Sequence, residues 1–148
     1  MTGRVFVDTN VLLYARDRKA DDKRVKAQAW LAALGESGLG HVNLQVINEY
    51  TRWVLVNERD RSLESVREEY ELLREWGDKP LDDDEVELAW AIRQRLGYQW
   101  FDCLLIAAAH LAGCAYFLTE DMGTGARFDA IRLVHPFKTA PAEILGQG

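Results

Sequence analysis

The chain has little of what marks a membrane, secreted or disulfide-bonded protein. It contains only two cysteines among 148 residues, and no apolar run approaches the roughly 18 residues of a membrane-spanning helix. Residues 1–4 contain neither the apolar stretch nor the cleavage site of a signal peptide. We therefore expect a cytoplasmic protein with no membrane association. The length and ordinary composition predict one globular domain over residues 1–148.

Histidine and cysteine are also too sparse for the metal sites that they usually build. The three histidines stand far apart at positions 41, 110 and 135, and no CxxC or HxxxH spacing is present. A zinc site is therefore not expected. Cys103 and Cys114 both lie in apolar segments, so we expect them to be small buried residues.

Positive charge is in short supply, with 18 Lys and Arg residues against 24 Asp and Glu and a net charge of −6. This balance argues against bulk electrostatic binding to nucleic acid. It does not exclude a nucleic-acid enzyme, because metal-binding carboxylates add negative charge and a local basic patch can still hold phosphates. One cluster of cations lies within residues 16–26, interrupted by acids, and we expect it to be ordinary solvated surface.

Apolar patterns predict strands and helices that alternate along the chain. Short apolar runs indicate buried strands, and apolar side chains spaced three and four residues apart indicate helices. Gly35 and Gly97 are expected to end helices. The predicted strands are 5–7, 41–42, 115–118 and 131–134, and the predicted helices are 9–15, 21–34, 44–57, 62–73, 82–96 and 100–112, with a glycine-containing loop at 122–127. This alternation predicts an α/β fold, a three-layer α/β/α sandwich with a mainly parallel central sheet.

Four acids stand at positions where a site would form. Asp8 follows the strand at 5–7 directly, and Asp121 follows the later strand that ends at Leu118. If these strands are parallel neighbours, both carboxylates emerge at one edge, where open α/β sheets bind ligands. Asp102 opens a largely apolar helix, where an unpaired charge is costly. Glu49 lies at the margin of an apolar helix face. We expect the four to converge.

Taken one at a time, each acid also has a purely structural explanation. Asp8 and Asp102 serve equally well as capping residues at helix starts. Asp121 is equally plausible as a turn residue, and Glu49 fits a solvated helix position. The denser acidic run at 82–87 is expected to be a solvated helix start. The joint placement of the four acids is what independent caps and turns would not require.

Several carboxylates in one site repel one another, and hard divalent cations such as Mg²⁺ or Mn²⁺ relieve that repulsion by binding oxygen ligands. Such a site can activate water and stabilise the charge on a phosphodiester under in-line attack. It needs no serine or histidine nucleophile, in keeping with the scattered histidines. The residue pattern therefore favours metal-dependent hydrolysis of phosphodiester bonds.

Five segments, read together and in order, form a specific set. They are VDTNVL at 7–12, INE at 47–49, WFDCLLIAAA at 100–109, GCAYFLTEDM at 113–122 and LVHPF at 133–137. Together they resemble the PIN-domain family, and within it the VapC-type toxins of toxin–antitoxin pairs. Two mild departures are Cys103, where the family often has alanine, and Glu120, an extra acid beside Asp121.

The resemblance implies a Mg²⁺- or Mn²⁺-dependent ribonuclease, usually a homodimer, that a cognate antitoxin protein inhibits. It implies that Asp8 and Asp102 are the principal metal ligands and that Glu49 and Asp121 are the remaining catalytic acids. RNA is then the expected substrate, cleaved by metal-activated water. The supporting residues, which would orient the acids through hydrogen bonds, are Asn10 and Thr119.

Three other functions stay open. A PIN-fold module that binds without catalysis fits the negative net charge. A metal-dependent DNA nuclease is also open, because nothing in the sequence reads the 2′-hydroxyl. A phosphate-transfer enzyme or receiver would use Asp8 as its nucleophile. The last is weak, because residue 10 is Asn rather than a second Asp.

The helices over residues 20–34 and 44–73 carry large apolar side chains beyond what a monomer of this size needs to expose. We expect some of them to form a groove for an antitoxin segment or a dimer interface. The residues are Trp30, Trp53, Val54, Tyr70 and Trp76.

Overall fold

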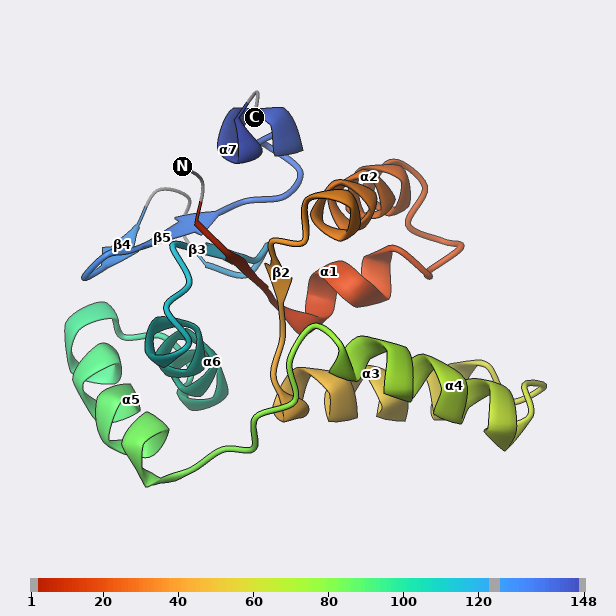
Figure 1. Ribbon diagram of the computed structural model, residues 1–148, viewed down its shortest axis with the longest axis horizontal. Coiled ribbons are helices and arrows are strands. Elements are labelled where there is room, and N and C mark those ends of the chain that lie inside the picture. The colour runs from red at the N-terminus through yellow and green to blue at the C-terminus, as the bar shows by residue number, and fades with distance from the viewer. Residues whose placement is uncertain (1–2, 123–125, 147–148) are drawn as a thin grey trace.

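The computed structural model of the chain describes residues 3–122 and 126–146 (Figure 1). Helices and strands alternate, as the apolar pattern predicts. In order they are β1 (Val5–Val7), α1 (Thr9–Tyr14), α2 (Asp22–Ser37), β2 (Gly40–His41), α3 (Leu44–Asn57), α4 (Leu63–Arg74), α5 (Asp83–Leu96), α6 (Trp100–Leu111), β3 (Tyr116–Leu118), β4 (Arg127–Phe128), β5 (Ile131–Val134) and α7 (Pro141–Leu145).

The strands form one sheet in the order β2-β1-β3-β5-β4. β1 pairs in parallel with β2 on one side and with β3 on the other, and β3 pairs in parallel with β5. β4, at the edge, runs antiparallel to β5. The register sets Val7 opposite Leu118, so the chain leaves β1 and β3 side by side at the same edge.

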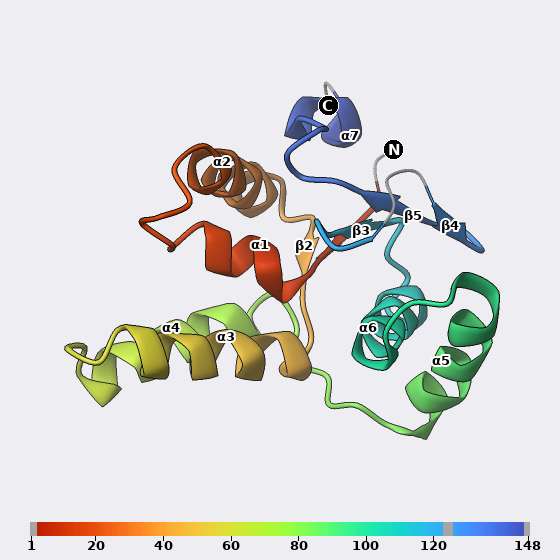
Figure 2. The same cartoon turned by 180° about the vertical axis from the view of Figure 1, so that it is seen from behind.

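Helices cover both faces of the sheet, and the predicted α/β/α sandwich with a mainly parallel sheet is confirmed. α2 and α7 lie on one side, and α5 and α6 lie on the other, in both views (Figures 1 and 2). α6 packs on β3 and is covered in turn by α5. α3 and α4 pack together and extend away from the sheet, and α1 contacts both α2 and α3.

The centre of the sheet and α6 supply much of the core. All three residues of β1 are buried, and Phe6 stacks on Phe117 of β3 with ring centres 5.4 Å apart. Residues 103–109 of α6 are all buried, as its apolar sequence predicts. Both cysteines are free and buried, as expected. No helix within the described ranges is long and apolar enough to cross a membrane.

One helix boundary and two elements differ from the prediction. α2 does not end at Gly35 but continues to Ser37 and ends at Gly38, which takes a left-handed φ of +71°. A glycine inside a helix costs only about 1 kcal/mol, and the buried Leu34 beside it keeps that turn packed. The apolar pattern does not predict β4 or α7, because both are short. Residues 123–125 of the predicted glycine-containing loop lie outside the described residues.

Glu85 corrects the expectation that the acidic run at 82–87 is a solvated helix start. The residues just before it are exposed, but Glu85 itself is fully buried. Its carboxylate pairs with the ammonium of Lys79 in the preceding loop. A buried carboxylate is tolerated when a cation accompanies it, so this acid has a structural role that the sequence pattern does not indicate.

Two of the apolar residues expected to line a partner groove belong instead to the core of the chain. Trp30 and Val54 are each 1% exposed. The indole N–H of Trp30 donates to the main-chain oxygens of Pro136 at 2.9 Å and Thr139 at 3.1 Å. These two side chains are therefore excluded from any partner surface. The other three expected residues are half-buried.

Candidate active site

Asp8 lies where β1 ends and α1 begins. Its main-chain N–H donates to the Leu118 carbonyl at 3.0 Å, which continues the pairing of β1 with β3. Its side-chain Oδ1 accepts the main-chain N–H of Thr9 at 2.7 Å, so it does cap α1. Its Oδ2 accepts the hydroxyl of Thr119 at 2.7 Å. This second contact, from the neighbouring strand, is more than a cap requires.

The Asp8 carboxylate is buried without a cation. The residue is 5% exposed, and no Lys, Arg or His in residues 3–122 and 126–146 forms an ion pair with it. Burial raises the pKa of Asp8 to about 7, and the charges of Asp102 and Asp121 add to this rise. The hydrogen bonds from Thr119 and Thr9 oppose it, because they stabilise the ionised form.

Asn10 and Thr119 connect Asp8 to Asp121. The Asn10 Nδ2 atom lies 3.0 Å from Asp121 Oδ2 and 3.4 Å from Asp8 Oδ2. The hydroxyl of Thr119 accepts the main-chain N–H of Asp121 at 3.2 Å while it donates to Asp8. The exposed Asp121 is thereby held beside the ends of β1 and β3.

Glu49 reaches this edge from α3. The hydroxyl of Thr9 donates to Glu49 Oε1 at 2.7 Å, and α1 packs against α3. The sequence pattern does not single out Thr9 for this contact. The sole signal is its position next to Asp8, because the contact depends on how α1 and α3 pack.

Asp102 lies in the first turn of α6 and is half-buried. Burial raises its pKa, and the charges of Asp121 and Glu49 raise it further. Since Asp102 and Asp121 also raise the pKa of Asp8, each of the four predicted acids interacts with at least one other. The structure therefore brings all four into one electrostatic site.

The donor set of this site suits a hard divalent cation. Its four carboxylates have no basic partner in the part of the chain that the structure describes, and the Oδ1 atom of Asn10 is buried there without a hydrogen-bond partner. Oxygen ligands of this kind are those that Mg²⁺ and Mn²⁺ prefer. Among the described residues, however, no three acidic, histidine or cysteine side chains form a group that could hold an ion as placed. The residues nevertheless fit a divalent cation in chemistry and charge.

Glu120, the extra acid beside Asp121, is used elsewhere. Its carboxylate accepts the hydroxyl of Tyr14 at 2.6 Å and pairs with Lys23 at 2.5 Å. Tyr14 ends α1 and Lys23 lies in the first turn of α2, with its ammonium 5.0 Å from the centre of the Tyr14 ring. These contacts tie the segment between Thr119 and Asp121 to both helices. The sequence pattern does not reveal this group of contacts, because its three members come from three separate segments.

Comparisons with known proteins identify a matching family model and several solved structures with a similar fold. The sequence matches the family model described as PIN domain over residues 5–129. The fold is similar to that of a toxin–antitoxin complex from Klebsiella pneumoniae, with a TM-score of 0.58, 17% identity and coverage of 89% of this chain and 97% of that chain. It is also similar to VapBC2 from Rickettsia felis bound to a DNA fragment from its promoter, with a TM-score of 0.58, 14% identity and coverage of 87% and 96%.

A further similar structure is VapC20 from Mycobacterium tuberculosis, a toxin that cleaves the sarcin–ricin loop. Its TM-score is 0.52, with 16% identity and coverage of 76% of this chain and 86% of that chain. No curated protein matches the sequence. At these identities the solved structures establish a shared fold.

Proposed function

The chain belongs to the PIN-domain family, and on this premise we propose that it is a metal-dependent endoribonuclease that acts as the toxin of a toxin–antitoxin pair. The proposal includes Mg²⁺ or Mn²⁺ as the cofactor, RNA as the substrate and a homodimer that a cognate antitoxin inhibits. The observation that carries it is the acidic site of Asp8, Glu49, Asp102 and Asp121, which has no basic partner in the described chain. Within it, burial and the neighbouring acids raise the pKa of Asp8 and of Asp102.

In this proposal Asp8 and Asp102 are the principal ligands of the ion. Asp8 is held by donors on both of its oxygens, so its position is set before an ion arrives. Glu49 and Asp121 are the remaining acids, and each is oriented by one side-chain hydrogen bond. A divalent ion bound here would neutralise the clustered charge, activate water and stabilise the phosphodiester during attack. The role of the protein itself is to position the four carboxylates at the edge of the sheet where β1 and β3 end.

The similar solved structures are all toxins or toxin–antitoxin complexes, the type of protein proposed here. One is a toxin–antitoxin complex, one is a VapBC pair bound to DNA of its promoter, and one is a toxin that cleaves an RNA loop. We propose by analogy that this chain has a cognate antitoxin and cuts a structured RNA. The analogy is one of fold, and the acidic site supplies the chemical argument.

RNA cleavage by purified protein tests the proposal. Wild type should cut a structured RNA in Mg²⁺ or Mn²⁺ and stop when EDTA is added. Asp8→Ala and Asp102→Ala should each reduce single-turnover cleavage at least about 1000-fold, because removing a metal ligand removes stabilisation made in the transition state. A matched control is Asp84→Ala, which removes an exposed acid in α5. If both variants of the site cut as fast as wild type, the proposed mechanism is wrong.

The same assay addresses the substrate. DNA of the same sequence should be cut much more slowly than RNA, and equal rates would replace the ribonuclease with a general nuclease. Sequencing of RNA ends after induction of wild type and of Asp8→Ala in cells would then identify the RNA and the bond that is cut. RNA ends that appear with wild type but not with Asp8→Ala would be products of cleavage at the acidic site.

One observation favours a second candidate, a PIN-fold module that binds without catalysis. The described residues include no three acidic, histidine or cysteine side chains that are placed to hold an ion together. An inert module predicts that Mn²⁺ does not bind at millimolar concentration. It also predicts that substitution of the four acids leaves partner binding unchanged.

A further inference from the structure

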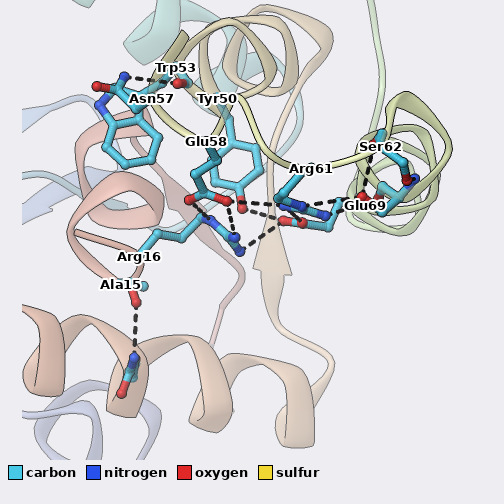
Figure 3. A network of polar contacts seen from close by, with 11 residues as sticks. Ala15, Arg16, Tyr50, Trp53, Asn57, Glu58, Arg61, Ser62 and Glu69 are labelled. Atoms are coloured by element: carbon cyan, nitrogen blue, oxygen red, sulfur yellow. Dashed lines mark hydrogen bonds and ion pairs between the residues drawn. The ribbon is translucent and has the colours of Figure 1, made fainter. Parts of the chain in front are cut away.

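A second polar surface lies at the other end of the contact between α1 and α3. It is a cavity of about 920 Å³ between the end of α1, the start of α2 and the second half of α3. Figure 3 shows part of its wall, with Trp53, Asn57 and Glu58 from the α3 side facing Ala15 and Arg16. The proposed active site does not use this cavity.

α3 joins the cavity to the acidic site. Glu49, Trp53 and Asn57 are spaced four residues apart, so they share one face of the helix. At one end of this face Glu49 accepts a hydrogen bond from Thr9 at 2.7 Å. At the other end Glu58 pairs with Arg16 at 2.6 Å. α1 and α3 therefore run side by side in the same direction, and the cavity begins about 6 Å along α3 from Glu49 at 1.5 Å per residue.

The lining of the cavity is positive, although the chain as a whole is not. Five cationic and three anionic side chains line it, a net charge of +2, on a chain whose net charge is −6. Two of the cations, Arg16 and Arg61, are paired with Glu58 and Glu69 (Figure 3). The other three, Arg18, Lys19 and Arg24, form no ion pair within the described residues.

Trp53 adds an aromatic surface to these cations. It lines the cavity and is half-buried. Among the residues that the structure describes, no aromatic ring stacks on it and no cation covers it. An aromatic face beside several cations is the combination by which proteins bind single-stranded nucleic acid, with a base stacked on the ring and phosphates at the cations.

We infer that this cavity binds a single-stranded segment of RNA next to the bond that is cut, with a base against Trp53 and phosphates at Arg18, Lys19 and Arg24. The inference rests on the proposed ribonuclease function and extends it to how the strand is held. An unpaired loop of a structured RNA supplies such a segment, because its bases are free to stack on protein side chains. The negative charge of an acidic protein segment would account for the cations alone, whereas a strand of RNA accounts for both the cations and the unstacked ring of Trp53.

Binding in EDTA tests the inference without cleavage. The probe is a fluorescein-labelled single-stranded RNA of about ten nucleotides, and anisotropy is measured over a series of salt concentrations. The triple variant Arg18→Gln/Lys19→Gln/Arg24→Gln should weaken binding at least about tenfold. The slope of log affinity against log salt should also fall by about 2, since each phosphate contact to a single strand contributes about 0.7.

The matched control changes the same charge elsewhere. Arg52→Gln/Arg127→Gln/Lys138→Gln removes two arginines and a lysine that are exposed and lie outside the cavity lining. It should weaken binding by less than about threefold and leave the slope nearly unchanged. Equal losses in the two triple variants would show a non-specific charge effect and would overturn the inference.

Trp53 separates stacking from charge. Trp53→Leu should weaken RNA binding at least about fivefold with the salt slope unchanged, and Trp53→Phe should restore most of it. Circular dichroism of both variants checks the fold, and Trp53→Phe keeps the test valid if Trp53→Leu unfolds. If all of these variants bind RNA as wild type does, or if the cationic triple loses a protein partner and keeps RNA, the cavity does not bind the strand.

The two proposals fail in different ways. If the acidic-site variants lose cleavage but the cavity variants keep normal RNA binding, the ribonuclease proposal is supported and the proposed strand-binding site is wrong. If wild type never cleaves RNA but binds it through the cavity residues, the proposed binding site is supported and the ribonuclease proposal is wrong.

Discussion

The two ends of the α1–α3 contact hold acids in opposite electrostatic settings. At one end the four acids around Asp8 have no basic partner in the described chain. At the other end Glu58 and Glu69 meet Arg16 and Arg61, and Arg16 contacts Glu58 through two nitrogens at 2.6 and 2.9 Å (Figure 3).

The pKa shifts follow the difference in partners. Burial raises the pKa of Asp8 to about 7, whereas the hydrogen bonds from Arg16 lower the pKa of Glu58. At the Arg16 end both acids, Glu58 and Glu69, are paired with arginines in a structural network. The Asp8 end retains unneutralised charge, which costs stability and is tolerated where a ligand compensates it.

The largest difference should appear in cleavage. Asp102→Asn keeps the size of the side chain and removes its charge, so RNA cleavage in Mg²⁺ should fall at least about 1000-fold. Glu69→Gln makes the same kind of change at the paired end, outside the cavity lining, and should alter cleavage less than about threefold when measured well below its melting temperature. Similar losses in both variants would mean that the acids of the two ends do not differ in function.

The dependence of stability on pH should have opposite signs at the two ends. A raised pKa in the folded state means that Asp8 favours folding when protonated, so its contribution is present at low pH and is lost as pH rises from about 4 to about 7. The shift from 3.8 to about 7 corresponds to at most about 4 kcal/mol. In EDTA, urea unfolding of Asp8→Asn should therefore be less sensitive to pH than that of wild type. If the free energy of unfolding depended on pH equally in Asp8→Asn and in wild type, this account of Asp8 would be wrong.

Arg16 should matter for stability and little for chemistry. Arg16→Met keeps the aliphatic stem but leaves Glu58 and Glu69 short of a partner, and we expect a loss of about 2 kcal/mol in the free energy of unfolding at pH 7. Since Arg16 lowers the pKa of Glu58, that stabilisation is present above the unfolded pKa and fades as pH falls. Urea unfolding at pH 7 and at pH 3 measures both effects. A loss that is the same at both pH values would show that packing, and not the ion pair, is responsible.

The smallest effect should come from the contacts of Glu120. Tyr14→Phe removes the hydroxyl that donates to Glu120 at 2.6 Å, which should cost about 1 kcal/mol of stability and lower kcat/KM a few-fold through the position of Asp121. Tyr98→Phe is the control, because no hydrogen bond of its hydroxyl is found within residues 3–122 and 126–146. Thermal unfolding and cleavage rates measure both. If Tyr14→Phe and Tyr98→Phe had the same stability and the same cleavage rate, Tyr14 would have no role in positioning Asp121.

The sequence predicts β1, β3 and β5 well because these strands are short, largely apolar runs with no competing pattern. Parallel pairing of β1 with β3 then places Asp8 beside Thr119, which strand-end reasoning anticipates. What it cannot predict are contacts between segments. The pairing of Lys79 with the buried Glu85 depends on a loop that folds back, and the contact of Thr9 with Glu49 depends on helix packing.

Binding of Mn²⁺ measured by calorimetry tests the central claim most directly, that the unpaired acids form a cation site. Wild type at neutral pH should bind Mn²⁺ with a millimolar or lower Kd. Asp102→Asn should lose that binding, and Glu58→Gln should retain it. The absence of Mn²⁺ binding by wild type, or equal binding by Asp102→Asn, would contradict the account.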